Sequence, residues 1–414
     1  MAAPGAPTAA RLQAPLLRPA KTSVAPARPG TPLSAAINLT ATAAGAGMLT
    51  LPWAFMRCGP GRCLGILAAL AVVTDVSLVL LVRVGRATGL VSFGPVVERL
   101  FGDAGSRGFQ ALMAFILFSA LTVFQRVVLD LLPMFLEELC SMSRGSLRPM
   151  AVSGLVNCCV LTACMSDTFH GLRFSSGASL ALLVPFVGGL LWKALDAIAD
   201  VEPVHPPVGE GSLQGLALAP ALLAGSLCCH FGIIEIDNEM QPKFRTHMYG
   251  VIHVVCLLVL PLTYALVGLA GVAALGADTS ENVLVAFEGD RLMQFARGLL
   301  SVTNALRMPL MVKPLLGLVR GISGGGPPGG ASRVLQVAAL LFCSLVLAQW
   351  MVALTSILGL LLGTVGVIGC YCLPGYMYLR LCRDGAGAAS GLRAGAYLTI
   401  AVGASTALLQ VAFQ

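Results

Sequence analysis

The stretch Gly45-Ala-Gly-Met-Leu-Thr-Leu-Pro-Trp-Ala-Phe55 lies inside an otherwise apolar segment that covers about 33–56. Gly45 and Gly47 let the backbone leave helical geometry, and Pro52 removes an amide donor soon afterwards. In lipid, such a break survives only where protein or a water-filled cavity satisfies the freed backbone groups. The half-helix that starts near Met48 would then direct unpaired amides at an anion such as a carboxylate. The alternative is a close helix–helix contact through small residues.

The whole chain has the composition of a membrane protein. It has 414 residues, of which 57% are hydrophobic and 11% are charged, and its mean hydropathy is +0.86. Soluble domains carry about 25% charged residues, so this chain has more apolar surface than soluble cores can bury. The composition excludes a nucleic-acid binder, a secreted disulfide scaffold and a disordered protein. We expect an all-α integral membrane protein that is embedded in the lipid bilayer as a monomer.

Apolar windows of about 20 residues, the length that crosses a bilayer, occur about eleven times. The predicted spans cover 33–56, 63–84, 108–137, 149–165, 177–195, 213–238, 249–275, 291–317, 333–351, 355–380 and 393–413. Residues 1–32 hold seven prolines and no acidic residue, which predicts a disordered cytoplasmic tail before a transmembrane domain over 33–413. An organelle transit peptide is the alternative interpretation of this tail.

The distribution of lysine and arginine predicts the orientation. Sixteen of these residues fall in segments on the side of the N-terminus, and six fall on the other side. Since cytoplasmic segments carry the excess of positive charge, we expect the N-terminus in the cytoplasm. The host membrane is left open between the plasma membrane and a vacuolar or lysosomal membrane.

Span 6 carries a second break in the corresponding place. Its stretch Ser226-Leu-Cys-Cys-His-Phe-Gly-Ile-Ile-Glu-Ile-Asp-Asn-Glu239 puts His230, Gly232 and Glu235 where lipid tolerates them poorly. Spans 1 and 6 open the two halves of a five-plus-five inverted repeat, and interrupted spans in corresponding positions mark a transporter's binding site. We therefore predict interruptions at 44–47 and 230–232 that face each other at mid-membrane.

Four motifs resemble those of one family. They are the stretch Gly45–Phe55 in span 1, Cys229-His230 with Glu239 downstream in span 6, Pro309 with Pro314 in span 8, and Ile368-Gly-Cys-Tyr-Cys-Leu-Pro-Gly-Tyr-Met-Tyr-Leu in span 10. Together they resemble the amino acid/auxin permease family, in its sodium-coupled neutral amino acid transporter branch. The resemblance covers about 34–382. It implies eleven spans in a LeuT/APC-like inverted repeat with broken helices 1 and 6, and secondary active transport of amino acids, neutral ones by this branch, through alternating access.

The predicted substrate site lies between the two breaks. Its residues are Thr42, Gly45, Ala46, Gly47 and Met48 on span 1, and Cys229, His230 and Phe231 on span 6. Backbone amides of the first group would hold the substrate carboxylate, because they would be unpaired at the start of a half-helix. Carbonyl groups of the second group would take the ammonium.

The coupling ion is left open between sodium and a proton. Sodium-coupled relatives are similar in placing an asparagine four residues before the first glycine of span 1, whereas this chain has Ala41 there. The oxygen ligands available for a sodium site near Thr303 are Ser301, Thr303 and Asn304, and Arg307 stands beside them. A fixed guanidinium could replace the charge of the ion, so we expect transport without sodium.

Other ionisable groups also lie within the spans. Asp75 is either a neutral hydrogen-bonding residue or a proton carrier. His230 is either a structural histidine or a proton-linked one, since an imidazole titrates near physiological pH. Arg126 and Asp130 are four residues apart on one helical face, which predicts a structural ion pair, with a gate as the alternative.

The sequence contains no Ser-His-Asp set, no paired catalytic carboxylates and no histidine-rich metal site, so we expect no enzyme and no cofactor apart from the coupling ion. The alternative function is an amino acid sensor or receptor with little transport. Most of the thirteen cysteines lie in apolar runs, where they act as small packing residues. A disulfide among Cys58, Cys63 and Cys140 is left open.

Overall fold

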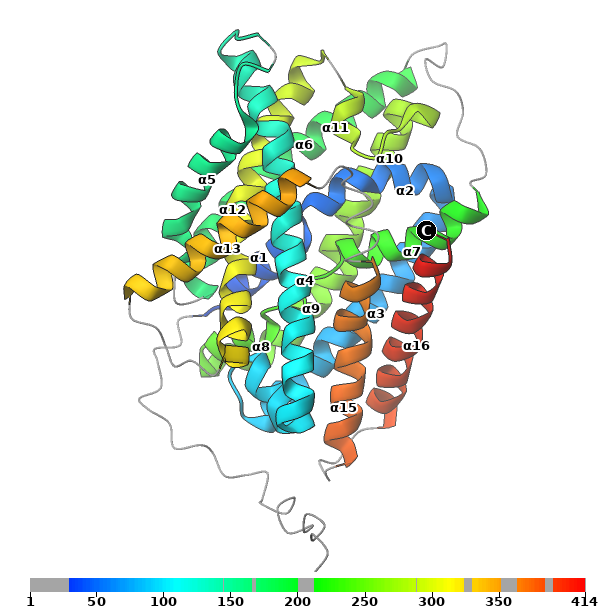
Figure 1. The fold of residues 1–414 in the computed structure, drawn as a ribbon. Coiled ribbons are helices and arrows are strands. Elements are labelled where there is room, and N and C mark those ends of the chain that lie inside the picture. The colour runs from blue at the N-terminus through cyan, green and yellow to red at the C-terminus, as the bar shows by residue number, and fades with distance from the viewer. Residues whose placement is uncertain are drawn as a thin grey trace, which may run out of the picture.

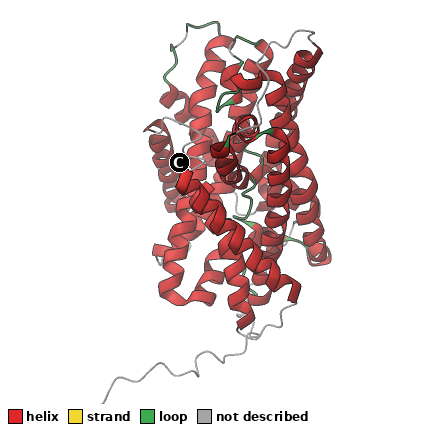
Figure 2. Cartoon of the chain, turned by 90° about the vertical axis from the view of Figure 1, so that its right-hand side faces the viewer, coloured by secondary structure: helices red, strands yellow, loops and turns green. Residues whose placement is uncertain are grey.

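The computed structural model describes residues 30–143, 145–165, 169–199, 212–287, 289–323, 330–350, 363–383 and 390–413. Over these residues the chain forms a bundle of helices with no β-strand beyond one isolated bridge (Figure 1). Most helices run along the long axis of the bundle (Figure 2). The predicted all-α fold is confirmed.

The first half of the chain supplies α1 (Pro32–Ala43), the 3-10 helix η2 (Ala46–Thr50), α2 (Leu51–Cys58), α3 (Pro60–Thr88), α4 (Phe93–Leu139), α5 (Pro149–Cys164) and α6 (Phe169–Ala199). Gly59 joins α2 to α3 with a φ of 90°, in the region that glycine adopts without strain. Proline then occupies the first position of α3, where its missing amide hydrogen costs no hydrogen bond.

The second half supplies α7 (Leu213–Ser226), α8 (Ile233–Glu239), η3 (Pro242–His247), α9 (Met248–Val254), the π-helix η4 (Val255–Val259), α10 (Leu260–Leu275), η5 (Gly276–Asp278), α11 (Val283–Ala286), α12 (Arg291–Ser323), α13 (Gly330–Trp350), the π-helix η7 (Ile368–Cys372), α15 (Leu373–Arg383) and α16 (Ser390–Phe413). The long helices α4 and α12 stand in corresponding places of the two halves and pack extensively against each other.

Seven helices of the described part are long and apolar enough to cross a membrane, and α1 with α2, bent by 49°, form an eighth candidate. The helices α5 and α7 are apolar but shorter. Arginine and lysine side chains lower the hydropathy of α12, which is 33 residues long. The chain is thus a multi-pass membrane protein, while the count of eleven spans stays a prediction. The start of predicted span 10 lies outside the described residues.

Both predicted helix breaks are present. The first lies at Ala44 and Gly45, between α1 and η2. The second runs over 227–232, between α7 and α8, and so begins three residues before the predicted position. The broken helices 1 and 6 are therefore confirmed, with the second break longer than expected.

The start of α1 is fixed to the end of α8. The amide of Gly30 donates to the Glu239 carbonyl at 2.9 Å, and the amide of Gln241 donates to the Gly30 carbonyl at 3.0 Å. Thr31 then caps α1 through a reciprocal pair of hydrogen bonds with Ser34. The folded part thus begins by Gly30, slightly before the predicted boundary at residue 33, while the rest of the predicted tail lies outside the described residues.

Two further predictions concern side-chain pairs. Arg126 and Asp130 form the expected ion pair at 2.9 Å, and Arg126 also donates to the Ala348 carbonyl at 3.1 Å, which ties α4 to α13. The thirteen cysteines all lie in the described part and are free thiols, so no disulfide joins Cys58, Cys63 or Cys140.

Candidate functional site

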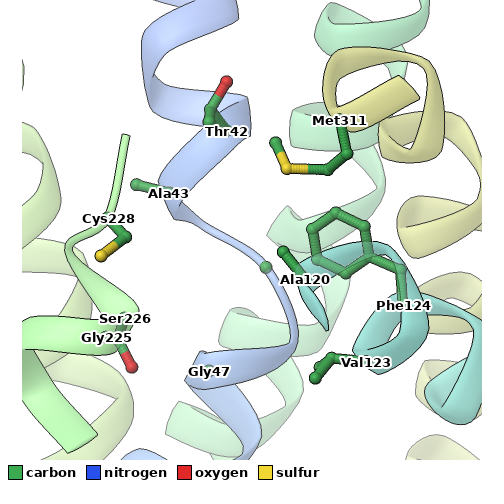
Figure 3. Close-up of a pocket in the computed structure, with 11 residues that line it drawn as sticks. Thr42, Ala43, Gly47, Ala120, Val123, Phe124, Gly225, Ser226, Cys228 and Met311 are labelled. Atoms are coloured by element: carbon green, nitrogen blue, oxygen red, sulfur yellow. The ribbon is translucent and has the colours of Figure 1, made fainter. Parts of the chain in front are cut away.

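A small cavity of about 40 Å³ lies where the two helix breaks meet (Figure 3). Its walls are Thr42, Ala43, Gly45 and Gly47 at the first break, Gly225, Ser226 and Cys228 at the second, Ala120, Val123 and Phe124 of α4, and Met311 of α12. In Figure 3, Phe124 and Met311 lie on one side of the thin segment after Ala43, and Cys228 lies on the other. The cavity has room for a few water molecules, at about 10–15 Å³ each, so an amino acid could enter only after side chains around it move.

One tyrosine hydroxyl joins the two breaks. Tyr264 of α10 is fully buried, and its Oη lies 2.9 Å from the carbonyl oxygen of Ala43 and 2.7 Å from that of Ser226. These carbonyls stand at the C-terminal ends of α1 and α7, where intrahelical donors run out. The sequence analysis did not identify Tyr264. A phenol in the middle of an apolar span was the available signal, because a buried hydroxyl needs a partner.

The two glycines of the first break allow close approach of other elements. A Cβ on Gly45 would lie 2.9 Å from Cε1 of Phe124, and a Cβ on Gly47 would overlap the Ser226 side chain. The first 3-10 hydrogen bond runs from the Met48 amide to the Gly45 carbonyl at 3.1 Å. The amides of Ala46 and Gly47 precede this bond and therefore have no intrahelical acceptor. Of these two residues, Gly47 lines the cavity, and binding of a substrate carboxylate by the amides stays a prediction.

Arg307 of α12 brings a buried positive charge to the same place. Its side chain is fully buried, and one terminal nitrogen lies 3.7 Å from the point where a Gly45 Cβ would stand. Its Nε donates to Ser179 Oγ of α6 at 3.3 Å, while its two terminal nitrogens have no hydrogen-bond partner among the described residues. A buried guanidinium without a partner is costly. Together with the Ala46 and Gly47 amides, it forms an arrangement that can bind a carboxylate.

The residues predicted as sodium ligands lie beside a fixed positive charge. Ser301 Oγ donates to the Arg297 carbonyl at 2.9 Å, Thr303 Oγ1 to the Ser179 carbonyl of α6 at 3.3 Å, and Asn304 Nδ2 to the Leu300 carbonyl at 2.8 Å. The Oδ1 atom of Asn304 is buried and has no hydrogen-bond partner in the described part. Thr303 and Arg307 both bind Ser179, so the guanidinium lies directly beside the predicted ligands. Ala41 is buried and offers no side-chain oxygen. A cation placed here would be repelled by Arg307.

The predicted residues of span 6 occupy different places. Cys229 and His230 are buried in the break, but the small cavity is lined by Cys228 instead. The His230 ring lies edge-on to Tyr371 of η7 with 5.8 Å between centroids, and neither of its nitrogens has a hydrogen-bond partner in the described part of the chain. Phe231 lines a second cavity. Of the predicted residues, the small cavity is thus lined by Thr42, Gly45 and Gly47 of span 1, and its described lining includes neither Met48 nor these three of span 6.

The second cavity has a volume of about 470 Å³ and follows the same seam between α4 and α12. Its lining includes Met113 and Leu117 of α4, Lys313 and Gly317 of α12, Phe231 and Glu235. Leu117 and Met113 lie one and two turns from Ala120, on the face of α4 that lines the small cavity. Volumes of about 300–1,000 Å³ are typical of small-molecule sites, so an amino acid would fit in this cavity.

Glu239 of α8 holds the ends of several helices together. Its carboxylate accepts hydrogen bonds from the amides of Phe169 and His170 at 3.0 and 2.9 Å and from Lys313 Nζ at 2.9 Å. A carboxylate at the N-terminus of α6 also interacts favourably with the helix dipole. Asn38 Nδ2 of α1 donates to the Phe169 carbonyl at 2.6 Å. Three elements, α6, α8 and α12, thus meet at one carboxylate, and α1 joins them through the bond of Asn38 to Phe169.

Asp75 has a partner that the sequence analysis missed. Its Oδ1 lies 2.7 Å from Nδ1 of His253 on α9, with the histidine side chain 51% exposed. On the same turn of α3, Thr74 Oγ1 lies 2.8 Å from Tyr371 Oη, and the Tyr371 ring contacts His230. His253 could have been noted from its position in an apolar span, because ionisable groups at membrane depth are rarely without function.

This fold is found in known membrane transporters. One solved structure that resembles it is that of Mhp1, a nucleobase-cation-symport-1 family transporter, in a closed conformation with bromovinylhydantoin bound. The two structures match over 96% of this chain and 95% of the Mhp1 chain. The TM-score is 0.66 and the sequence identity is 15%, so the likeness concerns the fold. It confirms the predicted inverted-repeat architecture with two broken helices.

The chain belongs to the transmembrane amino acid transporter protein family, whose model matches residues 28–413. Similar relatives are solute carrier family 38 member 8 of Homo sapiens, 25% identical over 68% of this chain and 66% of its own length, and amino acid transporter AVT6E of Arabidopsis thaliana, 23% identical over 63% and 56%. The chain thus matches less than two thirds of the length of each. The predicted family resemblance is confirmed, and this family and fold are those of transporters, not of enzymes.

Replacing Tyr264 with Phe removes the hydroxyl that both helix breaks share. Loss of one buried hydrogen bond costs about 1–2 kcal/mol, so we expect a lower melting temperature for the purified protein in detergent. Tyr397→Phe is the matched control, because that side chain is 64% exposed on α16. Equal melting temperatures for the two variants would contradict the role of Tyr264.

Proposed function

We propose that this protein is a secondary active transporter of amino acids that works by alternating access. The supporting observation is the meeting of two broken helices at a buried cavity, where unpaired amides and the Arg307 guanidinium converge. Relatives from Arabidopsis thaliana are named amino acid transporters, which agrees with a substrate that carries a carboxylate.

The substrate carboxylate binds between the amides of Ala46 and Gly47 and the terminal nitrogens of Arg307. The amides and the guanidinium are all hydrogen-bond donors, which suits a carboxylate. The bonds to the guanidinium are strong because they are charge-assisted. The ammonium lies toward the carbonyl oxygens of Ala43 and Ser226, at the negative ends of α1 and α7. The side chain points at the apolar part of the lining, which favours a small neutral amino acid.

The larger cavity is the route to the inner side. It continues along α4 and α12 from the small cavity, so movement of Phe124 or Met311 would connect the two. Opening at the inner end would move α1 away from α6 and α8, to which Asn38 and Gly30 bind. The N-terminus lies on the cytoplasmic side, as the excess of basic residues indicates, and the host membrane is the plasma membrane or a vacuolar or lysosomal membrane.

The coupling ion is a proton, and its carrier is Asp75 paired with His253. Arg307 occupies the place where a sodium ion would be needed, and an arginine keeps its proton. The pair of Asp75 and His253 can instead exchange a proton at membrane depth. Its ionisable surroundings are Tyr371, reached through Thr74, together with Arg83, Arg86 and Tyr249 toward the inner end of α3 and α9.

Gly45→Val should abolish amino acid uptake into proteoliposomes, because the added side chain would overlap Phe124 and fill the small cavity. Gly154→Val is the control, since a Cβ at that position of α5 meets open space. Both variants should be made at similar levels and purify as monodisperse protein. Normal uptake of a labelled amino acid panel by Gly45→Val would place the substrate site elsewhere. No uptake by the unmodified protein under any ion gradient would favour a receptor.

Replacement of sodium by choline should leave the uptake rate unchanged. Arg307→Met should reduce uptake at low substrate concentration by about tenfold to a hundredfold, since hydrogen bonds to charged groups contribute about 1.5–3 kcal/mol. Arg307→Lys retains the charge without the planar fork and should lie between the two. Loss of uptake in choline would mean that Thr303 and Asn304 bind sodium and that the role assigned to Arg307 is wrong.

Asp75→Asn should uncouple transport from the proton gradient. An inward proton gradient should stimulate uptake by the unmodified protein, whereas the variant should show the same rate with and without the gradient. Exchange of labelled for unlabelled substrate should persist in the variant, because the substrate site is unchanged. Asp196→Asn, at an exposed position of α6, is the control. Gradient stimulation of Asp75→Asn equal to that of the control would exclude Asp75 as the carrier.

A further inference from the structure

A third cavity, of about 370 Å³, lies at the inner ends of α3, α9 and α15. Arg83 and Arg86 come from α3, Tyr249 comes from α9, and Tyr378, Leu381 and Cys382 come from α15. None of these residues lines the two cavities on the seam between α4 and α12. The cavity is therefore separate from the proposed substrate route.

The charge of this cavity is only partly compensated. Asp237 binds Arg86 through two hydrogen bonds of 3.0 and 2.6 Å and also contacts Arg245 at 3.2 Å. One carboxylate thus serves two arginines. Arg83 forms no ion pair with the described residues, and its guanidinium lies 5.7 Å from the centre of the Tyr249 ring. The cavity therefore presents an exposed guanidinium with no anionic partner in the described part.

Two tyrosines shape the cavity around this charge. The Tyr249 ring lies under both guanidinium groups, at 4.7 Å from Arg86 and 5.7 Å from Arg83, which limits their orientations. Tyr378 is buried and lines the same cavity as Arg83. Guanidinium nitrogens and a phenol hydroxyl are both donors, and a phosphate offers several acceptor oxygens to such a set.

The position of the cavity along the helices favours a lipid headgroup as the source of a bound phosphate. Arg83 and Tyr249 lie near the inner ends of predicted membrane spans, at the level of lipid headgroups. Further along the same helical segment toward the bilayer centre, Val254, Leu257 and Leu258 are exposed by 52, 46 and 59%. A basic cavity with an adjoining apolar surface matches a headgroup with its acyl chains, and basic pockets between transmembrane helices bind anionic lipids.

We propose that this cavity binds the phosphate-bearing headgroup of an acidic phospholipid. The lipid would sit against α3, α9 and α15, with its phosphate between Arg83 and Tyr378 and its acyl chains along the exposed side chains of α9 and η4. A bound lipid would thus join a helix of the first half to two elements of the second half. This site is independent of the substrate site and of the proposed amino acid transport.

The test measures lipid binding to the purified full chain in detergent micelles by native mass spectrometry. The probes are phosphatidylserine, a phosphatidylinositol phosphate and phosphatidylcholine at equal concentrations. We expect the two acidic lipids to bind more tightly than phosphatidylcholine. Arg83→Gln should weaken their binding about fivefold, the effect of one basic residue near a membrane surface. Tyr378→Phe should weaken binding as well, without a change of charge.

Arg291→Gln is the matched control, because Arg291 is an exposed arginine at the first position of α12 and lies outside the cavity. Melting temperatures of all variants show whether each is folded. Equal binding of acidic lipids by Arg83→Gln and Arg291→Gln would overturn the proposal. Displacement of the lipid by inorganic phosphate at the same concentration would also overturn it, since the cavity would then be a site for a free anion.

Discussion

A helix that breaks inside a bilayer leaves backbone carbonyls without donors, and in this protein the Tyr264 hydroxyl reaches the carbonyls of both breaks. The hydroxyl has one hydrogen, so Ala43 and Ser226 share it. The ends of α1 and α7 are therefore held together by a third helix, α10, whose tyrosine is fully buried. This constraint sets the position of the small cavity, because the glycines that line it stand directly beside the shared carbonyls.

The sequence was sufficient for features whose cause is local. Gly45, Gly47 and Pro52 interrupt a helix wherever it packs, so the first break could be located from the residues alone. The second break begins earlier than predicted. Leu227 and the cysteines after it contain no helix breaker, so the sequence alone predicts that the helix continues there. Contacts with other spans decide their conformation instead. Other residues bind partners that lie far away in the sequence, as Ala43 binds Tyr264 and Asp75 binds His253. Their pairing depends on how each helix is rotated, which hydrophobic runs do not determine.

The end of the bundle that holds Glu239 shows how a few charges can link many helices. Glu239 receives two amides of α6 and the ammonium of Lys313, while the backbone of the same residue pairs with Gly30. A movement of α1 away from the bundle would break the backbone pairing and the contact of Asn38 with Phe169. It would leave Glu239 and Lys313 paired with each other, so the cost of opening would lie mainly in hydrogen bonds and not in separated charges.

Arg307 places a different constraint on the transport cycle. A sodium ion can leave with its substrate, whereas a guanidinium stays in the protein and keeps its charge. When a substrate carboxylate leaves, Arg307 is buried again without an ionic partner among the described residues, where its side chain hydrogen-bonds to the hydroxyl of Ser179. An unpaired buried charge costs several kcal/mol, and the empty protein bears this cost while the loaded protein does not. Return of the loaded form is thus favoured over return of the empty form. In the proposed mechanism, a fixed charge at this position makes exchange of substrates faster than net uptake, unless a second anion replaces the carboxylate.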